Sequence, residues 1–379
     1  MDRQKVISFG RGVPATEAIN RVKNEWYRIQ PEIQEMYGNS GFEYKSAFGD
    51  FGGAFGLRES IAERFEVSGD PKQRVICSNG GMEMIAHVIN SLPPGPVLVE
   101  EATYNRVLEH LGHINRQAIG VKLGEDGIDP RQLEETINTY SPVALYRIPF
   151  HQNPTGICAS EGNLYYVGAV CARYNIVDIA DIAYIDLRYD SALNFLPDTS
   201  AINLRNTIFI GSFSKTLSPG AKCGFGIIPE SFTKRIQSVV DNARLNPSYI
   251  TQFTYDQIMR NGFFDEQLLF LWELYAPRMN ALDSSIRDHL FLNVTPTTGG
   301  FFRFLALSNI SDGNALVQAA KANNLIIEPG IDCVPLNFRS QYNGRFPIRL
   351  TFPALTPEEI VEGTRRLACA YEGVIDLPV

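Results

Sequence analysis

One lysine of this sequence stands where it could act as a nucleophile. Lys215 lies in the stretch Gly211–Gly226, which reads GSFSKTLSPGAKCGFG and follows the apolar run Thr207–Ile210. That run is typical of a buried strand, so the lysine comes just past a strand end. Desolvation and the second cation of Lys222 both lower a lysine pKa, and a lowered pKa makes the amine reactive toward aldehydes. A surface lysine in a turn is the alternative, but the spacing favours a Schiff-base lysine.

Further groups that could do chemistry come at the ends of other predicted strands. Asn153 opens the segment NPTG after the strand Val143–Phe150. Asp181 is the last residue of the predicted strand Ile176–Asp181, and Tyr184 follows it. Ligands of open parallel α/β sheets bind beyond the carboxyl ends of the strands. We therefore expect these side chains to meet at one edge of a sheet.

A glycine turn is a candidate anion site. The strand Arg74–Ser78 breaks at Asn79, and Gly80, Gly81 and Met82 lead into the predicted helix. The free backbone N–H groups and the dipole of a helix N-terminus both favour a phosphate. Glycines alone are a weak signal, so this assignment depends on the other motifs.

These motifs, in this order, resemble those of the fold-type I pyridoxal-5′-phosphate (PLP) enzymes of the class I/II aminotransferase superfamily. The similarity is greatest to the branch with 2-aminoadipate-type aminotransferases and the aminotransferase-like domains of MocR regulators. The family signature is S-x-S-K, three residues, P-G, one residue and R-x-G. This chain matches it except that Lys222 stands in place of the arginine. The resemblance implies that Lys215 carries the internal aldimine with PLP.

The resemblance also implies roles for the other candidates. Asp181 would keep the pyridine nitrogen protonated, so that the ring can act as an electron sink, and Asn153 and Tyr184 would lie at the 3-oxygen. Tyr104 would stack on the ring, and Arg349, in PIRLTF, would grip the substrate's α-carboxylate through two parallel hydrogen bonds. The remaining cofactor-binding residues would be Gly80, Gly81, Met82, Ser212, Ser214 and Lys222, and Gly12 would line the substrate pocket beside Asn153 and Arg349.

Several of these residues have a structural alternative. Tyr104 could cap a helix start, Arg349 could be an ion-pair partner, and NPTG could be a plain β-turn. Asp178 and Asp186 compete with Asp181, but the D-x-x-Y spacing favours Asp181.

Two departures from the family pattern concern the cofactor phosphate. Phe48 stands where the family has a tyrosine whose phenol reaches the phosphate of the neighbouring subunit, and phenylalanine has no hydroxyl. The ammonium group of Lys222 cannot donate two parallel hydrogen bonds to the phosphate, as the guanidinium of an arginine can. We therefore expect looser cofactor binding than in the family at large.

Composition narrows the class of protein. The chain has 379 residues, 44% of them hydrophobic and 20% charged, and a net charge of −8. The acidic balance argues against a nucleic-acid surface, and we find no apolar stretch that could span a membrane and no signal core. A cytoplasmic location is expected. The histidines and six cysteines show no metal-binding spacing, so no metal site is predicted.

Strands and helices alternate through the first two thirds of the chain, which predicts an α/β fold. The resemblance implies PLP-transferase fold type I: a large domain with a mostly parallel, seven-stranded-type sheet between helices, and a small α+β domain. The expected division is 1–45 for an N-terminal segment joining the small domain, 46–280 for the large domain and 281–379 for the small one. Long helices are expected at Glu17–Ile33 and Asp265–Leu290, and a strand at Thr298–Leu307. A homodimer is implied.

Transamination between an α-amino acid and a 2-oxo acid is the expected reaction. Elimination or replacement at the β- or γ-carbon, cyclisation and decarboxylation are alternatives within the same chemistry. A non-catalytic effector-binding domain is an alternative of another class, which the acidic charge disfavours.

Overall fold

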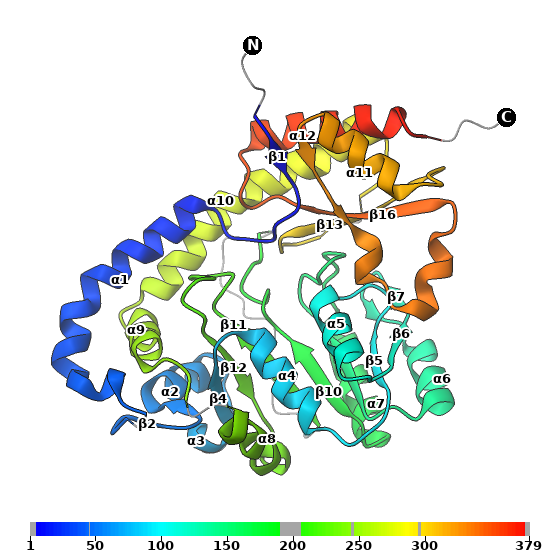
Figure 1. Ribbon diagram of the computed structural model, residues 1–379. Coiled ribbons are helices and arrows are strands. Elements are labelled where there is room, and N and C mark those ends of the chain that lie inside the picture. Colours follow the sequence, from blue (N-terminus) through cyan, green and yellow to red (C-terminus); the bar gives the residue numbers. More distant parts are fainter. Residues whose placement is uncertain (1–4, 45, 190–205, 244–245, 295–296, 376–379) are drawn as a thin grey trace.

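The computed structural model describes residues 5–44, 46–189, 206–243, 246–294 and 297–375. Its centre is a seven-stranded sheet in the order β4-β12-β11-β10-β9-β5-β6 (Figure 1). Strand β12 is antiparallel to both of its neighbours, and the other pairs are parallel. The predicted α/β class with a mostly parallel sheet is therefore confirmed. The strands are Val75–Ser78 (β4), Val97–Glu100 (β5), Ala118–Val121 (β6), Ala144–Arg147 (β9), Val177–Asp181 (β10), Thr207–Ser212 (β11) and Gly224–Ile227 (β12).

Both faces of this sheet are buried. Val97 and Val99 belong to one hydrophobic cluster, whereas Leu98 between them belongs to another. This follows from the alternation of side chains along a strand, and it explains why the strands read as continuous apolar runs. The helices in and around this part of the chain are Thr16–Tyr37 (α1), Phe55–Arg64 (α2), Pro71–Arg74 (α3), Gly81–Ser91 (α4), Asn105–His113 (α5), Pro130–Tyr140 (α6), Glu161–Arg173 (α7), Glu230–Ala243 (α8), Tyr249–Arg260 (α9) and Phe263–Ser285 (α10).

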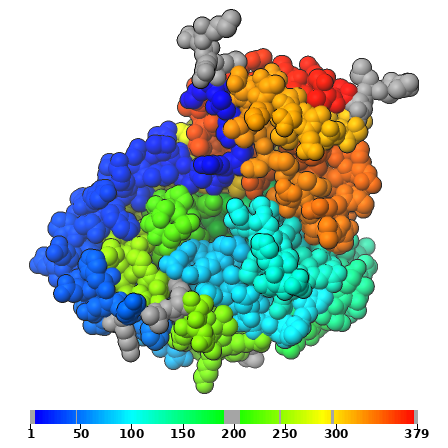
Figure 2. Space-filling view, viewed as in Figure 1, coloured from blue at the N-terminus to red at the C-terminus, as the bar shows by residue number. Residues whose placement is uncertain are grey.

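A second layer lies above the large sheet and joins the two ends of the described chain. Its sheet has the order β13-β16-β15, from Phe302–Ser308 (β13), Arg345–Thr351 (β16) and Glu328–Pro329 (β15). Helices Gly313–Ala322 (α11) and Pro357–Glu372 (α12) cover it, and Ile7–Ser8 (β1) pairs with Leu325–Ile326 (β14). Figure 2 shows the blue N-terminal residues against the orange C-terminal part. The expected division into residues 1–45, 46–280 and 281–379 stays a prediction.

Short two-stranded ribbons complete the described strands, namely Gly49–Asp50 (β2) with Gly53–Ala54 (β3), and Leu123–Gly124 (β7) with Gly127–Ile128 (β8).

Local signals placed most helices correctly but misplaced some ends. The first helix continues four residues beyond the expected end, to Tyr37. The long helix α10 passes at Ile286 into a π-helical turn that ends at Leu290, which is the expected end of this helical segment. The strand expected from Thr298 begins only at Phe302. Gly300 explains this difference because it has a φ of +78°, a backbone conformation that an extended strand does not use.

Candidate active site

Every residue predicted for the site lines one pocket, an open cavity of about 560 Å³ between the large sheet and the second layer. These residues are Gly12, Gly80, Gly81, Met82, Tyr104, Asn153, Asp181, Tyr184, Ser212, Ser214, Lys215, Lys222 and Arg349. They come from segments far apart in the sequence. The carboxyl ends of β4, β5, β9, β10 and β11 bring most of them together, as the rule for parallel sheets predicts. Gly12, between β1 and α1, and Arg349, on β16, reach the pocket from the second layer.

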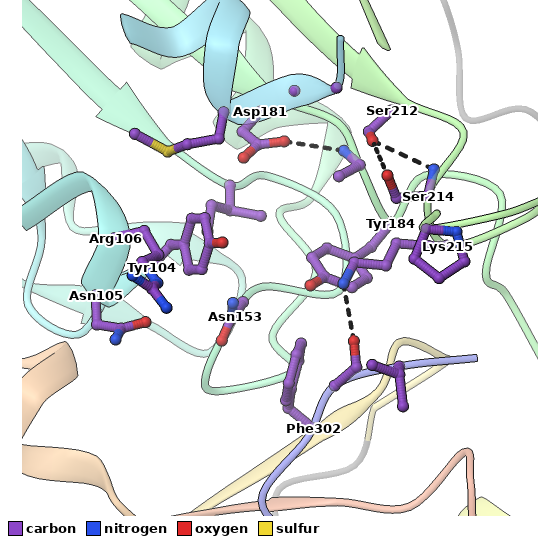
Figure 3. A pocket seen from close by; sticks show the side chains of 18 of the residues that line it. Tyr104, Asn105, Arg106, Asn153, Asp181, Tyr184, Ser212, Ser214, Lys215 and Phe302 are labelled. Atoms are coloured by element: carbon purple, nitrogen blue, oxygen red, sulfur yellow. Dashed lines mark hydrogen bonds between the residues drawn. The ribbon is translucent and has the colours of Figure 1, made fainter. Parts of the chain in front are cut away.

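Lys215 points into this pocket just past the end of β11 (Figure 3). Its Nζ donates a hydrogen bond to the carbonyl oxygen of Gly12 at 2.9 Å. Burial lowers the pKa of Lys215 to about 8; Asp181 opposes this shift, and the positive charges of Arg349 and Lys222 add to it. The amine is therefore partly neutral near physiological pH, which a nucleophile or a base requires.

Asp181 is a buried carboxyl group that forms no ion pair with an arginine among the described residues. Its Oδ2 accepts a hydrogen bond from the Tyr146 hydroxyl at 2.9 Å, and its Oδ1 accepts one from the backbone nitrogen of Ala183 at 3.1 Å. Burial raises the pKa of Asp181 to about 6, against these hydrogen bonds and the charge of Lys215. A protonated ring nitrogen would give this buried carboxylate a directly hydrogen-bonded cationic partner.

The two competing aspartates are occupied elsewhere. Asp178 forms a buried ion pair with Arg147, with an N–O distance of 2.7 Å, and Asp186 forms a partly exposed ion pair with Arg64 at 2.6 Å. Neither aspartate lines the pocket. The geometry therefore favours Asp181 as the carboxylate that faces the cofactor.

Arg349 has donor capacity to spare on the pocket wall. Its guanidinium donates to the side-chain oxygen of Asn153 at 3.3 Å and to the carbonyl oxygen of Gly10 at 3.4 Å, which are both long contacts. Its Nε is buried and has no hydrogen-bond partner among the described residues. The Arg349 guanidinium also lies over the ring of Phe302, 5.2 Å from the centroid. A carboxylate would satisfy these donors, and no ion-pair partner is seen for Arg349 within the described chain.

Aromatic rings and an amide complete the middle of the pocket. Figure 3 shows Lys215 and Tyr184 on one side, facing Tyr104 and Asn153. Tyr104 is the residue before α5, yet its side chain makes no capping hydrogen bond, so the capping alternative is not supported. Burial raises the pKa of Tyr184 well above its ordinary value, while a hydrogen bond with Asn153 opposes that shift.

The far end of the pocket could hold a phosphate. Gly80, with a φ of +104°, turns the chain from β4 into α4, whose first N–H groups have no partner within the helix. The Ser212 and Ser214 hydroxyl oxygens are 3.1 Å apart, and Lys222 lines the same end. Gly224 cannot carry a side chain here because its Cβ would lie 2.6 Å from the carbonyl carbon of Gly80. Donors, a positive charge and a close backbone therefore fit a phosphate dianion.

Phe48 does not line this pocket. Its ring is 43% exposed and packs edge-on against Tyr37, with 5.1 Å between the centroids. In the family pattern, the tyrosine at this position reaches the cofactor phosphate of the neighbouring subunit. Within the described residues of one chain, Phe48 does not lie at the phosphate end of the pocket.

A buried network that the sequence did not reveal supports the NPTG turn. The Gln152 amide nitrogen donates to Glu100 at 2.8 Å and to the carbonyl oxygen of Ala102 at 2.6 Å, while its oxygen accepts from the backbone and hydroxyl of Thr155, both at 2.8 Å. The carboxyl of Glu100 also accepts from the backbone nitrogen of Ile148 at 3.2 Å. These contacts fix the backbone on both sides of Asn153. Only the pairing of β5 with β9 could have revealed them.

Replacing Glu100 with glutamine is expected to make stability less sensitive to pH. Burial raises the pKa of Glu100 to about 8, so the folded chain keeps this proton over a range in which the unfolded chain releases it. The contribution of Glu100 to stability is therefore present at low pH and lost as the pH rises toward that folded value. The thermal midpoint of Glu100→Gln relative to the unsubstituted protein should rise by a few degrees between about pH 5 and about pH 8.

The control is Glu161→Gln, which changes an exposed carboxylate at the start of α7. Its difference from the unsubstituted protein should stay nearly constant over the same range. A constant difference for Glu100→Gln as well would contradict the neutral, buried acid.

The fold and the site together define a PLP-dependent enzyme of fold type I. The chain belongs to the aminotransferase class I and II family, whose model matches residues 4–367. It is 27% identical over 385 residues to a 2-aminoadipate transaminase of Thermus thermophilus, covering 99% of this chain and 92% of that protein. It is 24% identical over 380 residues to aromatic-amino-acid aminotransferase 1 of Thermococcus litoralis, covering 97% and 88%.

The solved structures agree with this assignment. The α-aminoadipate aminotransferase of T. thermophilus, complexed with N-(5′-phosphopyridoxyl)-L-leucine, superimposes with a TM-score of 0.84 at 24% identity, covering 97% of this chain and 92% of that chain. At this identity the likeness shows the fold. The protein is thus an aminotransferase, and its cofactor is pyridoxal 5′-phosphate. Among the described residues, no helix is long and apolar enough to cross a bilayer.

Proposed function

We propose that this enzyme moves the amino group of an α-amino acid to a 2-oxo acid, with Lys215 as the amine that carries the cofactor. The observation that carries the proposal is the position of Lys215 in one pocket with Asp181 and Arg349, where burial lowers its pKa to about 8. When bound, PLP supplies an aldehyde that condenses with primary amines and a ring that withdraws electrons.

The residues of the pocket fit a single orientation of this cofactor. Asp181 would hold the ring nitrogen in its protonated form, because it is a buried carboxylate that lines the pocket and accepts its hydrogen bonds from neutral groups. The phosphate would lie at the N-terminus of α4 with Ser212, Ser214 and Lys222, and Asn153 and Tyr184 would bind the ring oxygen between these two ends. Tyr104 would cover one ring face.

Arg349 and Lys215 would have different roles toward the substrate: Arg349 binds its carboxylate, and Lys215 acts on its α-carbon. Arg349 would bind the α-carboxylate through donors that the described residues leave free, and this contact would place the α-carbon beside Lys215. Lys215, as a neutral amine, would accept the proton from the α-carbon of the substrate and hold it as an ammonium group. Gly12 has to be a glycine, since a Cβ there would lie 2.8 Å from the Phe302 ring that supports Arg349.

The proposal is tested by incubating the PLP-loaded enzyme with single amino acids and no 2-oxo acid. The panel should begin with 2-aminoadipate and aromatic amino acids, which the names of the relatives suggest. Conversion of PLP to pyridoxamine 5′-phosphate, with one equivalent of 2-oxo acid, supports transamination. Release of an eliminated, cyclised or decarboxylated product, with PLP retained, would point to the divergent chemistry instead, and binding without reaction would point to an effector-binding domain.

A matched control probes Arg349. Each accepted amino acid should be compared with the amine that lacks its α-carboxylate. We expect the amine to react at least about 100-fold less efficiently, because a charge-assisted, two-pronged hydrogen bond is lost. Equal reaction of both compounds would contradict the carboxylate role.

Substituting Lys222 with arginine is expected to tighten PLP binding. Lys222 has a left-handed backbone, with a φ of +55°, and lines the phosphate end of the pocket. Arginine at the same position offers two parallel donors to the phosphate, so the dissociation constant should fall by about three- to tenfold. Titration of the apoprotein with PLP measures this directly.

Two further variants complete that experiment. Phe48→Tyr restores the hydroxyl that the family pattern includes, and it too should tighten binding. Lys234→Arg, on the exposed side of α8, is the control and should leave the dissociation constant unchanged. No change for either Lys222→Arg or Phe48→Tyr would contradict the idea that these departures loosen the phosphate site.

A homodimer is part of the proposal. Large apolar side chains that precede Phe48 in the sequence are exposed, among them Phe42 at 81% and Tyr44 at 76%. An exposed patch of this kind is typical of a protein interface. Sedimentation equilibrium tests it, since a monomer at micromolar concentration would contradict the dimer. The cytoplasmic location and the division into 1–45, 46–280 and 281–379 also remain proposals.

A further inference from the structure

Tyr146 meets Asp181 because of the register of two strands. Strands β9 and β10 are parallel, with Tyr146 opposite Ile179. Alternate residues of a strand share a face, so Asp181 lies on the same face as Ile179, diagonally across from Tyr146. An aromatic side chain is long enough to bridge that diagonal. The Tyr146 side chain is fully buried, and its hydroxyl donates to Oδ2 of Asp181 at 2.9 Å.

On the opposite face of β9 and β10, an aspartate is paired with an arginine. Arg147 reaches Asp178 diagonally in the other direction and donates two hydrogen bonds, at 2.9 and 2.7 Å. The Thr207 hydroxyl adds a third at 3.0 Å. The charge of Asp178 is therefore neutralised within the core. Asp181, three residues further on, receives hydrogen bonds from neutral groups, so its negative charge stays available to the pocket.

We propose that Tyr146 is a positioning residue for the cofactor: its hydroxyl fixes the Asp181 carboxylate toward the pocket and stabilises its ionised form without neutralising it. An arginine or lysine at this place would hold the carboxylate equally well but would compete with a protonated ring nitrogen for its charge. The inference rests on the proposed role of Asp181. It assigns to Tyr146 no contact with the substrate or with the cofactor.

The Tyr146 hydroxyl affects the pKa of the Asp181 carboxyl. A hydrogen bond to the charged form of an acid lowers its pKa, so the Tyr146 hydroxyl partly offsets the upward shift that burial causes at Asp181. The other titratable groups that interact with this carboxyl are Glu100, Tyr104, Tyr184 and Lys215. All of these stay in place when the hydroxyl of Tyr146 alone is removed.

The test is the PLP dissociation constant of apo Tyr146→Phe, measured between about pH 5 and about pH 8, which spans the Asp181 pKa of about 6. We expect binding at neutral pH to be about tenfold weaker, because a hydrogen bond to a charged group is lost. The pH below which affinity declines should also move upward by about one unit. This shift is a signature that a purely structural tyrosine would not produce.

Tyr275→Phe is the matched control. It also removes a buried phenolic hydroxyl that makes one hydrogen bond, with the backbone nitrogen of Ala15 at 2.9 Å, and Tyr275 does not line the pocket. It should lower thermal stability and leave the pH dependence of PLP binding unchanged. An unshifted pH dependence in Tyr146→Phe, with stability lowered as in the control, would overturn the inference.

The variant Asp181→Asn distinguishes an error in the role of Tyr146 from an error in the proposed role of Asp181. If Asp181→Asn weakens PLP binding and Tyr146→Phe does not, the role of Tyr146 is wrong and that of Asp181 stands. If Asp181→Asn leaves PLP binding unchanged, the orientation proposed for the cofactor is wrong, and the inference falls with it.

Discussion

Replacing Lys215 with alanine is expected to lower the rate of transamination by about 10⁴-fold or more, because one side chain is both the cofactor-carrying amine and the base at the α-carbon. Lys215 is the lysine whose Nζ reaches Gly12 across the pocket, with a pKa lowered to about 8. Lys215→Arg should be equally inactive, although it keeps a positive charge, since a guanidinium stays protonated and cannot act as a base. Single-turnover formation of pyridoxamine 5′-phosphate is the measurement.

Two controls accompany this prediction. The thermal midpoints of both apo variants should lie within a few degrees of the unsubstituted protein, because Lys215 makes a hydrogen bond to one carbonyl group and no ion pair in the described chain. A small primary amine added to Lys215→Ala should restore part of the rate by acting as an external base. Retention of more than about a tenth of the activity by Lys215→Ala would show that another group carries the chemistry.

Replacing Asp181 with asparagine is the second large expected effect. The carboxylate charge would no longer hold a proton on the ring nitrogen, so the ring would withdraw electrons less strongly. We expect kcat/KM to fall by about 10²- to 10³-fold, the range for breaking one partner of a buried charge pair. Tyr146 could still donate its hydrogen bond to the amide oxygen, whereas the amide nitrogen would then face the backbone N–H of Ala183, so the variant removes the charge and one hydrogen bond.

Asp186→Asn is the matched control for this substitution. Asp186 is also a largely enclosed aspartate, 13% exposed, but it pairs with Arg64 and lies outside the pocket. The control should lose some stability and keep its activity. Comparable losses of activity in both variants would mean that the effect comes from destabilised folding and not from the charge that faces the cofactor.

Much of the site could be predicted from the sequence because its chemistry comes in short local motifs. Asn153, Asp181 and Lys215 each follow an apolar run, and the carboxyl ends of parallel strands must meet at one edge of the sheet. That single rule places groups together that are tens of residues apart. The glycine turn before α4 could be predicted in the same way, since strand, glycines and helix are adjacent in the chain.

The supporting contacts could not be predicted, because they depend on the pairing and register of strands. Tyr146 lies near Asp181 only if β9 pairs with β10 with Ile179 opposite Tyr146. A shift of one residue would turn the tyrosine to the other face. The contact of Gln152 with Glu100 likewise needs β5 beside β9, and the approach of Gly12 to Phe302 needs the two ends of the chain to meet.

The proposal that Lys215 carries the cofactor is tested most directly by identifying the residue to which PLP is attached. The PLP-loaded enzyme is reduced with borohydride, which makes the attachment permanent, and its peptides are analysed by mass spectrometry. We predict a phosphopyridoxyl group on Lys215, within the peptide that follows β11. A group on Lys222, or no modified lysine in a protein that binds PLP, would contradict the central claim.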